Sequence, residues 1–265
     1  EICACLVGSE MCIRDRLRTL KEKTFGSWNI EITEVKGKDT PATEGFDFYI
    51  FEHTVPKVLP KDGIIFLVNP DSSADAGFSI VRRNVQVNDY DGDGASLAIG
   101  DGEHPLVRYM DVEGIKVTQY SQVDEASLER YDVLMYYEGN PVFFARNEAD
   151  SKIAVMTFSL NMSTLALSVY YPILIYNMFN YYLPSTLTED LCDVYDTIEV
   201  NARGSDLIVT APDGTELLFG EFPAKLYVES FGTYTLRQQL ISGEIVEEKF
   251  YAKVAASQSD ITRED

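Results

Sequence analysis

Residue types that commonly bind metals or act as nucleophiles are scarce in this sequence. It contains two histidines, His53 and His104, and a single cysteine, Cys192, beyond the first twelve residues. No Cys-x-x-Cys pair occurs, so a zinc site built from thiolate or imidazole ligands has too few donors. One cysteine in the body of the chain also argues against a disulfide framework, although it fits any compartment.

Basic side chains are few as well. The chain has 22 Lys and Arg residues against 43 Asp and Glu residues, which gives a formal net charge of −21. Because such a chain repels phosphate backbones, we expect no nucleic-acid partner. An anionic membrane surface is disfavoured for the same reason. A solvated acidic surface is the simplest interpretation of this charge.

The motifs of common enzyme classes are missing. A Ser-His-Asp hydrolase on an α/β sheet needs a G-x-S-x-G elbow, and a glutamine amidotransferase needs a glycine-flanked Cys. Neither is present, and Cys192 lies in a predicted connection between two domains. No glycine-rich phosphate loop or dinucleotide fingerprint occurs. We therefore assign no catalytic residue and expect no cofactor.

Two polar residues follow predicted buried strands and are the side chains that a catalytic hypothesis would use. His53 comes after FDFYIF and is a candidate base, and Ser159 comes after KIAVMTF. Ser163 lies in the next turn, where backbone N–H groups can bind an anion or where the hydroxyl can cap a helix. A single histidine without a nucleophile motif is more often structural.

One segment has the spacing of metal ligands. In DYDGDG the carboxylates of Asp89, Asp91 and Asp93 and the glycine at position six, Gly94, match the start of an EF-hand loop. Position twelve is Gly100 where a bidentate Glu is needed, and the flanking sequence is not helical. Calcium binding by these three aspartates is one hypothesis, and a solvated turn is the other.

The longest uncharged stretch runs from Ile153 to Thr188. Its second half has the length of a membrane helix. Against a span, Asn177 and Asn180 form a polar stripe, and tyrosines occur along the whole length. Pro172 fits the first turn of a helix, which shortens the helix to about Tyr171–Leu183, or ~20 Å. The stretch therefore predicts a buried strand, a turn and a buried helix.

The remaining pattern predicts an α/β domain followed by a β domain. The runs at 46–51 and 63–68 are typical of strands covered on both faces, and 131–137 with 141–145 suggest a hairpin. We expect an open sheet of the glutamine-amidotransferase-like or flavodoxin-like type, in a degenerate form. Beyond Pro184, short β-prone runs separated by turn signals predict a small all-β, Ig-like sandwich.

The domain boundaries follow from these changes in composition. Residues 1–16 resemble a translated adapter-derived stretch, so we set them aside as a non-native leader. The predicted segments are an α/β domain over 17–186, a β-sandwich over 190–256, and a polar linker or truncation point over 257–265. Leu17–Thr24 is a short helical candidate within the first domain.

Several segments together resemble the region after the von Willebrand factor A domain in BatA-type bacterial membrane proteins. They are FDFYIFEHTVPKVLP, GIIFLVNP, HPLVRYMDVEGIKV, GNPVFFAR, SKIAVMTFSL, NMSTLALSVYYPILIYNMFNYYLP, VYDTIEV, FGTYTL and FYAKVAASQSDI. The resemblance covers roughly residues 17–262. It implies a degenerate glutamine-amidotransferase-like domain and a small β-sandwich, on the extracytoplasmic face of the cell membrane. The membrane anchors would be segments outside this chain.

Two functions of different classes follow. The first is a non-catalytic interaction or assembly segment with protein partners in the cell envelope. The alternative is a hydrolase or amidotransferase-like enzyme that uses His53 or Ser159 at the carboxyl edge of the sheet. A calcium-dependent adhesion module through Asp89, Asp91 and Asp93 is a third hypothesis.

Overall fold

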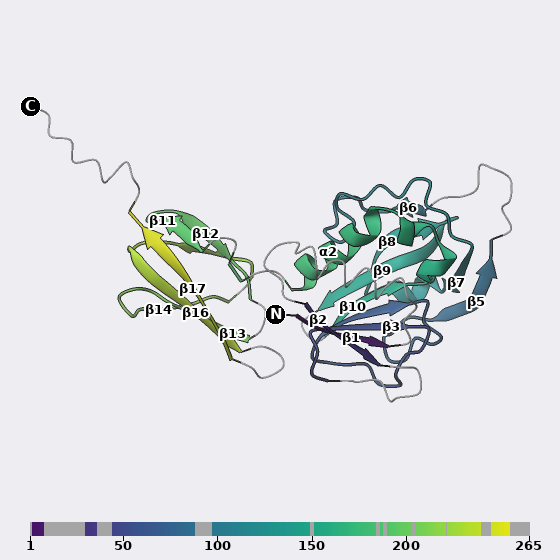
Figure 1. Ribbon diagram of the computed structural model, residues 1–265, viewed down its shortest axis with the longest axis horizontal. Coiled ribbons are helices and arrows are strands. Elements are labelled where there is room, and N and C mark those ends of the chain that lie inside the picture. The colour runs from purple at the N-terminus through teal and green to yellow at the C-terminus, as the bar shows by residue number, and fades with distance from the viewer. Residues whose placement is uncertain are drawn as a thin grey trace, which may run out of the picture. The chain divides into compact units, whose positions relative to one another are not determined.

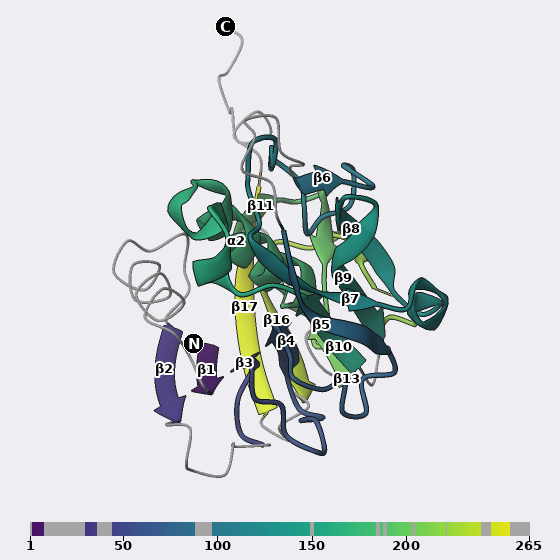
Figure 2. The same ribbon diagram turned by 90° about the vertical axis from the view of Figure 1, so that its right-hand side faces the viewer.

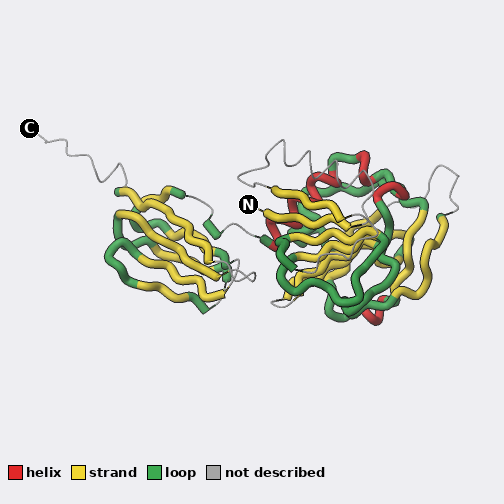
Figure 3. The backbone as a smooth tube through the Cα atoms, turned by 60° about the horizontal axis from the view of Figure 1, so that its bottom comes forward, coloured by secondary structure: helices red, strands yellow, loops and turns green. Residues whose placement is uncertain are grey.

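The chain forms two compact units, Glu1–Tyr182 and Leu183–Asp265. The computed structural model describes residues 2–7, 30–35, 44–87, 97–148, 151–183, 186–187, 190–202, 205–220, 222–239 and 245–254. The helical candidate Leu17–Thr24 and the three aspartates of DYDGDG lie outside these described residues. Strands dominate both units, as the yellow segments of Figure 3 show.

An eight-stranded sheet forms the centre of the first unit, in the order β2-β1-β3-β4-β10-β9-β8-β6 (Figure 1). Its first five strands pair in parallel, and β10, β9, β8 and β6 pair antiparallel. The strands are β1 (Ile2–Val7), β2 (Ile30–Val35), β3 (Phe48–Glu52), β4 (Ile64–Val68), β6 (Leu97–Ile99), β8 (Asp132–Tyr137), β9 (Asn140–Glu148) and β10 (Ser151–Met156). A separate antiparallel pair consists of β5 (Ile80–Gln86) and β7 (Gln119–Val123).

The middle of the sheet is covered on both faces. All residues of β3 and β4 are buried, as their apolar runs predict. On one face, helix α2 (Tyr170–Tyr182) places Phe179 against Phe48, with ring centroids 5.1 Å apart. On the other face, Tyr49 and Phe51 belong to a core that includes Leu128 of the short 3₁₀ helix Glu125–Leu128. Successive strand residues alternate between these two cores.

The prediction of an α/β, flavodoxin-like open sheet is wrong. That fold needs a helical crossover between successive parallel strands. Here residues 53–63 connect β3 to β4 without a helix, and the connection from β4 to β10 carries β5 to β9. Within the described residues, α2 is the one α-helix, and it follows the last strand of the sheet. Apolar runs indicate that a strand is covered but not by which kind of element.

Residues 2–7, which we set aside from the fold on the basis of sequence, form strand β1. This strand pairs in parallel with β2 on one side and with β3 on the other, as Figure 2 shows at one edge of the sheet. The run ICACLV is apolar and contains β-prone residues, which suits a strand inside a parallel sheet.

The uncharged stretch folds as a buried strand, two short 3₁₀ turns and a buried helix. Strand β10 is followed by the turns Leu160–Met162 and Leu165–Leu167, and then by the 13 residues of α2. The prediction of a buried helix in place of a membrane span is confirmed by this burial. Among the described helices, none has the length and apolarity needed to cross a bilayer.

The described part of the second unit contains strands and no helix. A five-stranded sheet has the order β11-β17-β16-β13-β14, and a two-stranded sheet pairs β12 with β15. The strands are β11 (Leu191–Asp193), β12 (Thr197–Val200), β13 (Ser205–Thr210), β14 (Glu216–Leu218), β15 (Ala224–Tyr227), β16 (Gly232–Gln239) and β17 (Ile245–Lys253). This five-plus-two arrangement does not support the expected Ig-like sandwich. Cys192, expected in a linker, is buried in β11.

Candidate functional site

A chain of three polar side chains lies at the carboxyl edge of the parallel strands. His53 directly follows β3, Asn69 directly follows β4, and Ser121 lies in β7. Ser121 Oγ donates a hydrogen bond to Asn69 Oδ1 over 3.3 Å, and Asn69 Nδ2 lies 3.3 Å from His53 Nδ1. Because the amide oxygen of Asn69 accepts from Ser121, its NH₂ group is left to donate to the imidazole. The neutral ring then carries its proton on Nε2.

Backbone contacts hold this chain in place. The N–H of Asn69 donates to the carbonyl of Met156 over 2.7 Å, and the N–H of Ser121 donates to that of Thr157 over 2.8 Å. His53 and Asn69 both have left-handed backbone conformations, with φ of 63° and 42°. Such positions cost energy for residues other than glycine and often accompany functional sites. Asn69 and Ser121 were not among the sequence candidates, although Asn69 follows a buried strand as His53 does.

Ser159, the other sequence candidate, belongs to a different hydrogen-bonding group. Its buried hydroxyl donates to the side-chain oxygen of Asn161, and its carbonyl accepts from the N–H of Met162 in the following turn. Nearby in sequence, Thr157 Oγ1 is buried and has no hydrogen-bond partner among the described residues. The hydroxyls of Ser121 and Ser159 both donate to amide oxygens, which are not bases. Neither is therefore arranged as an activated nucleophile.

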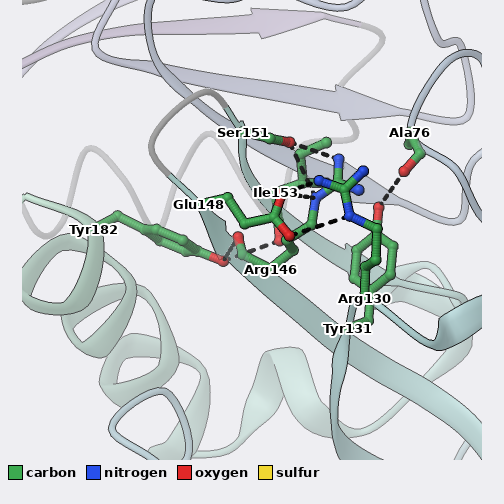
Figure 4. A network of polar contacts seen from close by, with 8 residues as sticks. All are labelled: Ala76, Arg130, Tyr131, Arg146, Glu148, Ser151, Ile153 and Tyr182. Carbon is green, nitrogen blue, oxygen red and sulfur yellow. Dashed lines mark hydrogen bonds and ion pairs between the residues drawn. The ribbon is translucent and has the colours of Figure 1, made fainter.

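A second polar network surrounds Arg146 of β9 (Figure 4). The guanidinium donates to Ser151 Oγ from Nε and Nη2, at 3.1 and 2.6 Å, and lies 4.9 Å from the ring centre of Tyr131. Glu148 bonds Arg130 and lies 3.9 Å from Arg146 Nε. The network therefore balances its own charges and leaves no group directed at a ligand.

Two tyrosines complete this network. Tyr131 Oη donates to the carbonyl of Ala76 over 2.6 Å, and burial raises the pKa of Tyr131 to about 12 despite the nearby Arg146. Tyr182 Oη bonds the carbonyl of Ile153 over 3.0 Å, and burial likewise raises the pKa of Tyr182 well above its ordinary value. Both phenols remain neutral donors at neutral pH, which is the property of a structural clamp.

The described residues contain no group of three or more His, Cys, Asp or Glu side chains placed to hold a metal ion. The calcium hypothesis concerns Asp89, Asp91 and Asp93, which lie outside the described residues. It therefore stays a prediction.

The largest exposed apolar surface feature of the first unit is a pocket of about 550 Å³ beside the start of α2. We call it the apolar groove, and its lining residues are Tyr109, Leu167, Ser168, Val169, Pro172, Ile173, Tyr176 and Asn177. Leu167 is 82% exposed and Tyr109 is 79% exposed. No lining residue carries a charge. Clustered exposed apolar side chains of this kind mark interaction sites more often than scattered ones do.

Local hydrogen bonds hold the walls of the groove. Asn177 Nδ2 donates to the carbonyls of Leu106 and Arg108, at 3.2 and 2.8 Å, which fixes the loop that carries Tyr109. The backbone of Thr164 bonds that of Lys116 over 2.9 Å just before the turn that presents Leu167. The groove is therefore preorganised, and its exposed side chains do not depend on a partner for their position.

This groove was not expected from the sequence. The whole uncharged stretch was assigned to the core, because an apolar segment looks the same whether it faces the core or solvent. The signal that was available is the run LALSV between two turns, since a 3₁₀ turn of three residues cannot bury every side chain.

Another pocket, of about 410 Å³, lies in the second unit between β14 and β15. Its lining includes Asp213, Glu216, Lys225 and Glu229. Mixed charges of this kind are ordinary for a solvated surface, so the apolar groove is the stronger candidate.

Comparisons with known proteins indicate a fold and no family. No protein-family model matches the sequence, and no curated protein matches it. Among solved structures, the chain is similar to the cytoplasmic protein STM3548 from Salmonella typhimurium, with a TM-score of 0.50 and 10% identity, over 68% of this chain and 98% of that chain. At this identity the likeness concerns the fold alone.

Two further similar structures have TM-scores below 0.5 and carry no argument. They are the cytoplasmic protein STM1381 from Salmonella typhimurium LT2 (TM-score 0.49, 9% identity, 68% of this chain, 99% of that chain) and a candidate GMP synthase protein from Thermoplasma acidophilum (0.41, 11%, 68%, 96%). The structures similar to this chain thus include a glutamine-amidotransferase-like one at low identity, and none of the comparisons links the chain to BatA-type proteins.

Proposed function

We propose that this chain is a non-catalytic interaction segment that binds a protein partner through the apolar groove. The observation that carries the proposal is the clustering of Tyr109, Leu167, Val169 and Tyr176 on one preorganised and uncharged surface. Burying such side chains on association gains about 25 cal/mol per Å² of apolar area, before the costs of association. The resemblance of the sequence to BatA-type proteins suggests that the partner is another protein of the bacterial envelope, on its extracytoplasmic face.

The chemistry of the carboxyl edge supports a role without catalysis. His53 is hydrogen-bonded to Asn69, and Ser159 to Asn161, so neither pair combines a nucleophile with a base. An amide between a hydroxyl and an imidazole can orient the ring but cannot accept the proton of a serine nucleophile.

Peptide display on the immobilised full chain tests the groove. Binders are selected on the wild type and then compared on a Leu167→Asn, Val169→Asn double variant, in which two exposed side chains change and the net charge does not. We expect most selected clones to lose binding to this variant and to keep binding to a Leu218→Asn control in the second unit. Clones that bind all three proteins equally, or no enrichment at all, would contradict the proposed function.

The proposed location has its own test in cells that carry the full gene. Protease added to intact spheroplasts should digest an epitope in this chain, whereas a cytoplasmic marker should survive. Protection of the epitope until the membrane is lysed would exclude the extracytoplasmic face.

The hydrolase or amidotransferase-like alternative is favoured by one observation, the strained backbone of His53 and Asn69 at the carboxyl edge. It predicts turnover of an ester, amide or glutamine substrate that falls in His53→Ala or Ser159→Ala variants. The proposed function predicts no turnover by the wild type and unchanged groove binding in both variants.

A further inference from the structure

We propose that the groove's partner is a basic amphipathic helix, that is, a helix with an apolar face and a Lys- and Arg-rich polar face. This inference rests on the proposed function and adds the chemistry of the partner. Three observations carry it: the elements that line the groove, the charges at its rim and the charge of the chain.

The elements that line the groove favour a helix over an extended strand. The lining residues come from the 3₁₀ turn ending at Leu167, from the first two turns of α2 and from the loop at Tyr109. None of these elements offers the open backbone edge that an added β-strand requires. Binding must therefore come from side chains that enter the groove. A volume of about 550 Å³ accommodates a few large apolar side chains, which an amphipathic helix presents at spacings of three and four residues.

The rim of the groove is acidic. The segment 101–116 passes beside the groove, held to α2 by Asn177 and to Thr164 by Lys116. Its exposed charged residues are four acids, Asp101, Glu103, Asp111 and Glu113, and two bases, Arg108 and Lys116. Arg108 lies over the ring of Tyr109, 5.9 Å from its centre. An uncharged floor with a net negative rim is complementary to an apolar face flanked by basic side chains.

The charge of the whole chain excludes the simplest competing occupant. Two copies of a chain with a formal net charge of −21 repel each other, so self-association through the groove is disfavoured. The same field attracts a basic partner and raises its rate of association at low salt. The partner that fits both the floor and the field is thus apolar on one face and cationic on the other.

The test uses three labelled model peptides of about 18 residues and the full chain, with fluorescence anisotropy as the measurement. The first peptide has a Leu face and a Lys face, the second has the same Leu face and a Glu face, and the third has the composition of the first in a scrambled order. We expect the first peptide to bind at least about tenfold more tightly than either of the others. Raising the salt from about 0.05 to 0.3 M should weaken this binding several-fold.

Matched variants separate docking at the groove from general attraction to an acidic protein. Asp111→Asn with Glu113→Gln should weaken the Lys peptide several-fold. Glu125→Gln with Glu129→Gln makes the same change of charge on the opposite face of the sheet and should leave binding unchanged. Leu167→Asn with Val169→Asn should remove most of the binding without altering the charge.

Each outcome supports or overturns the inference. Equal weakening by both acid-to-amide pairs, equal binding of the scrambled peptide, or no binding of the Lys peptide at about 100 µM would overturn it. If the Glu peptide binds as tightly as the Lys peptide and both depend on Leu167 and Val169, the basic partner is wrong but the groove still binds proteins. Failure of the display selection would instead remove the proposed function itself.

Discussion

At the scale of single residues, Arg146 combines a full charge with almost complete burial. Its guanidinium bonds Ser151 and lies against the ring of Tyr131. Replacing it with Met keeps much of the volume but leaves the Ser151 hydroxyl without its donor. We expect Arg146→Met to lower the free energy of unfolding by about 1–3 kcal/mol.

Arg130→Met is the matched control, because Arg130 also bonds Glu148 but is largely exposed. Exposed ion pairs contribute little, so we expect a loss of at most about 1 kcal/mol. Urea unfolding of both variants measures the difference. Equal losses would mean that burial does not distinguish the two arginines.

His104 gives the first unit a defined dependence on pH. Burial lowers the pKa of His104 below its ordinary value and outweighs the opposite effects of Asp132 and Asp101. Its Nδ1 accepts a hydrogen bond from the N–H of Leu106 over 3.2 Å, which requires an unprotonated nitrogen. The unfolded chain therefore binds a proton more readily than the folded chain does. Stability from this group is complete above about pH 6.5 and is lost as the pH falls below it.

A His104→Asn variant tests this dependence, since the Asn side chain keeps an acceptor near the position of Nδ1 but does not titrate. Urea unfolding at pH 8 and pH 5.5 should show a smaller loss of stability in the variant than in the wild type. Parallel losses would show that other groups set the acid sensitivity.

At the scale of elements, α2 is the helix that positions the groove. Asn177 is buried in α2 and its amide satisfies two carbonyls of the neighbouring loop. We expect Asn177→Ala to cost about 1–3 kcal/mol because the carbonyls lose their donor. Hydrogen exchange should rise in segment 101–116 and stay unchanged in β16 and β17. Unchanged exchange in that segment would show that the loop is held by other contacts.

Most strands could be predicted from the sequence, because turn chemistry and apolar runs are local properties. The hairpin of β8 and β9 is an example: Glu138 and Gly139 form a two-residue loop with φ of 48° and 75°, and Tyr137 pairs with Asn140. The elements that cover the sheet could not be predicted in this way. The apolar residues of β3 and β4 require cover on both faces, but a helix and a loop with a 3₁₀ turn both provide it.

The sites show the same limit. His53 could be selected because it follows a buried strand, but its partners Asn69 and Ser121 come from segments far along the chain. Leu167 and Val169 were expected in the core, and only the folded chain shows that the 3₁₀ turn directs them outward. Exposure depends on contacts between distant segments, which periodicity within one segment does not report.

At the scale of the whole molecule, the two units have separate cores. Leu67 belongs to the core of the first unit, and Leu236 belongs to that of the second. Both are fully or almost fully buried, so replacement of either by Ala should cost about 2–5 kcal/mol. Differential scanning calorimetry should show two transitions, with Leu67→Ala lowering one and Leu236→Ala lowering the other. A single transition that both variants shift would mean that the units unfold as one.

Strand β10 pairs in parallel with β4 and antiparallel with β9, and this has a consequence for the order of folding. The strands β8, β9 and β10 follow one another closely in the chain, so their pairing closes only short loops. Pairing of β10 with β4 must close the long segment between them, which costs more entropy and delays it. Pulse-labelling during refolding should therefore protect amides in the β9–β10 ladder before those in the β3–β4–β10 ladder. Strand β10 would then be the template on which the parallel half of the sheet assembles, and simultaneous protection of both ladders would argue against that role.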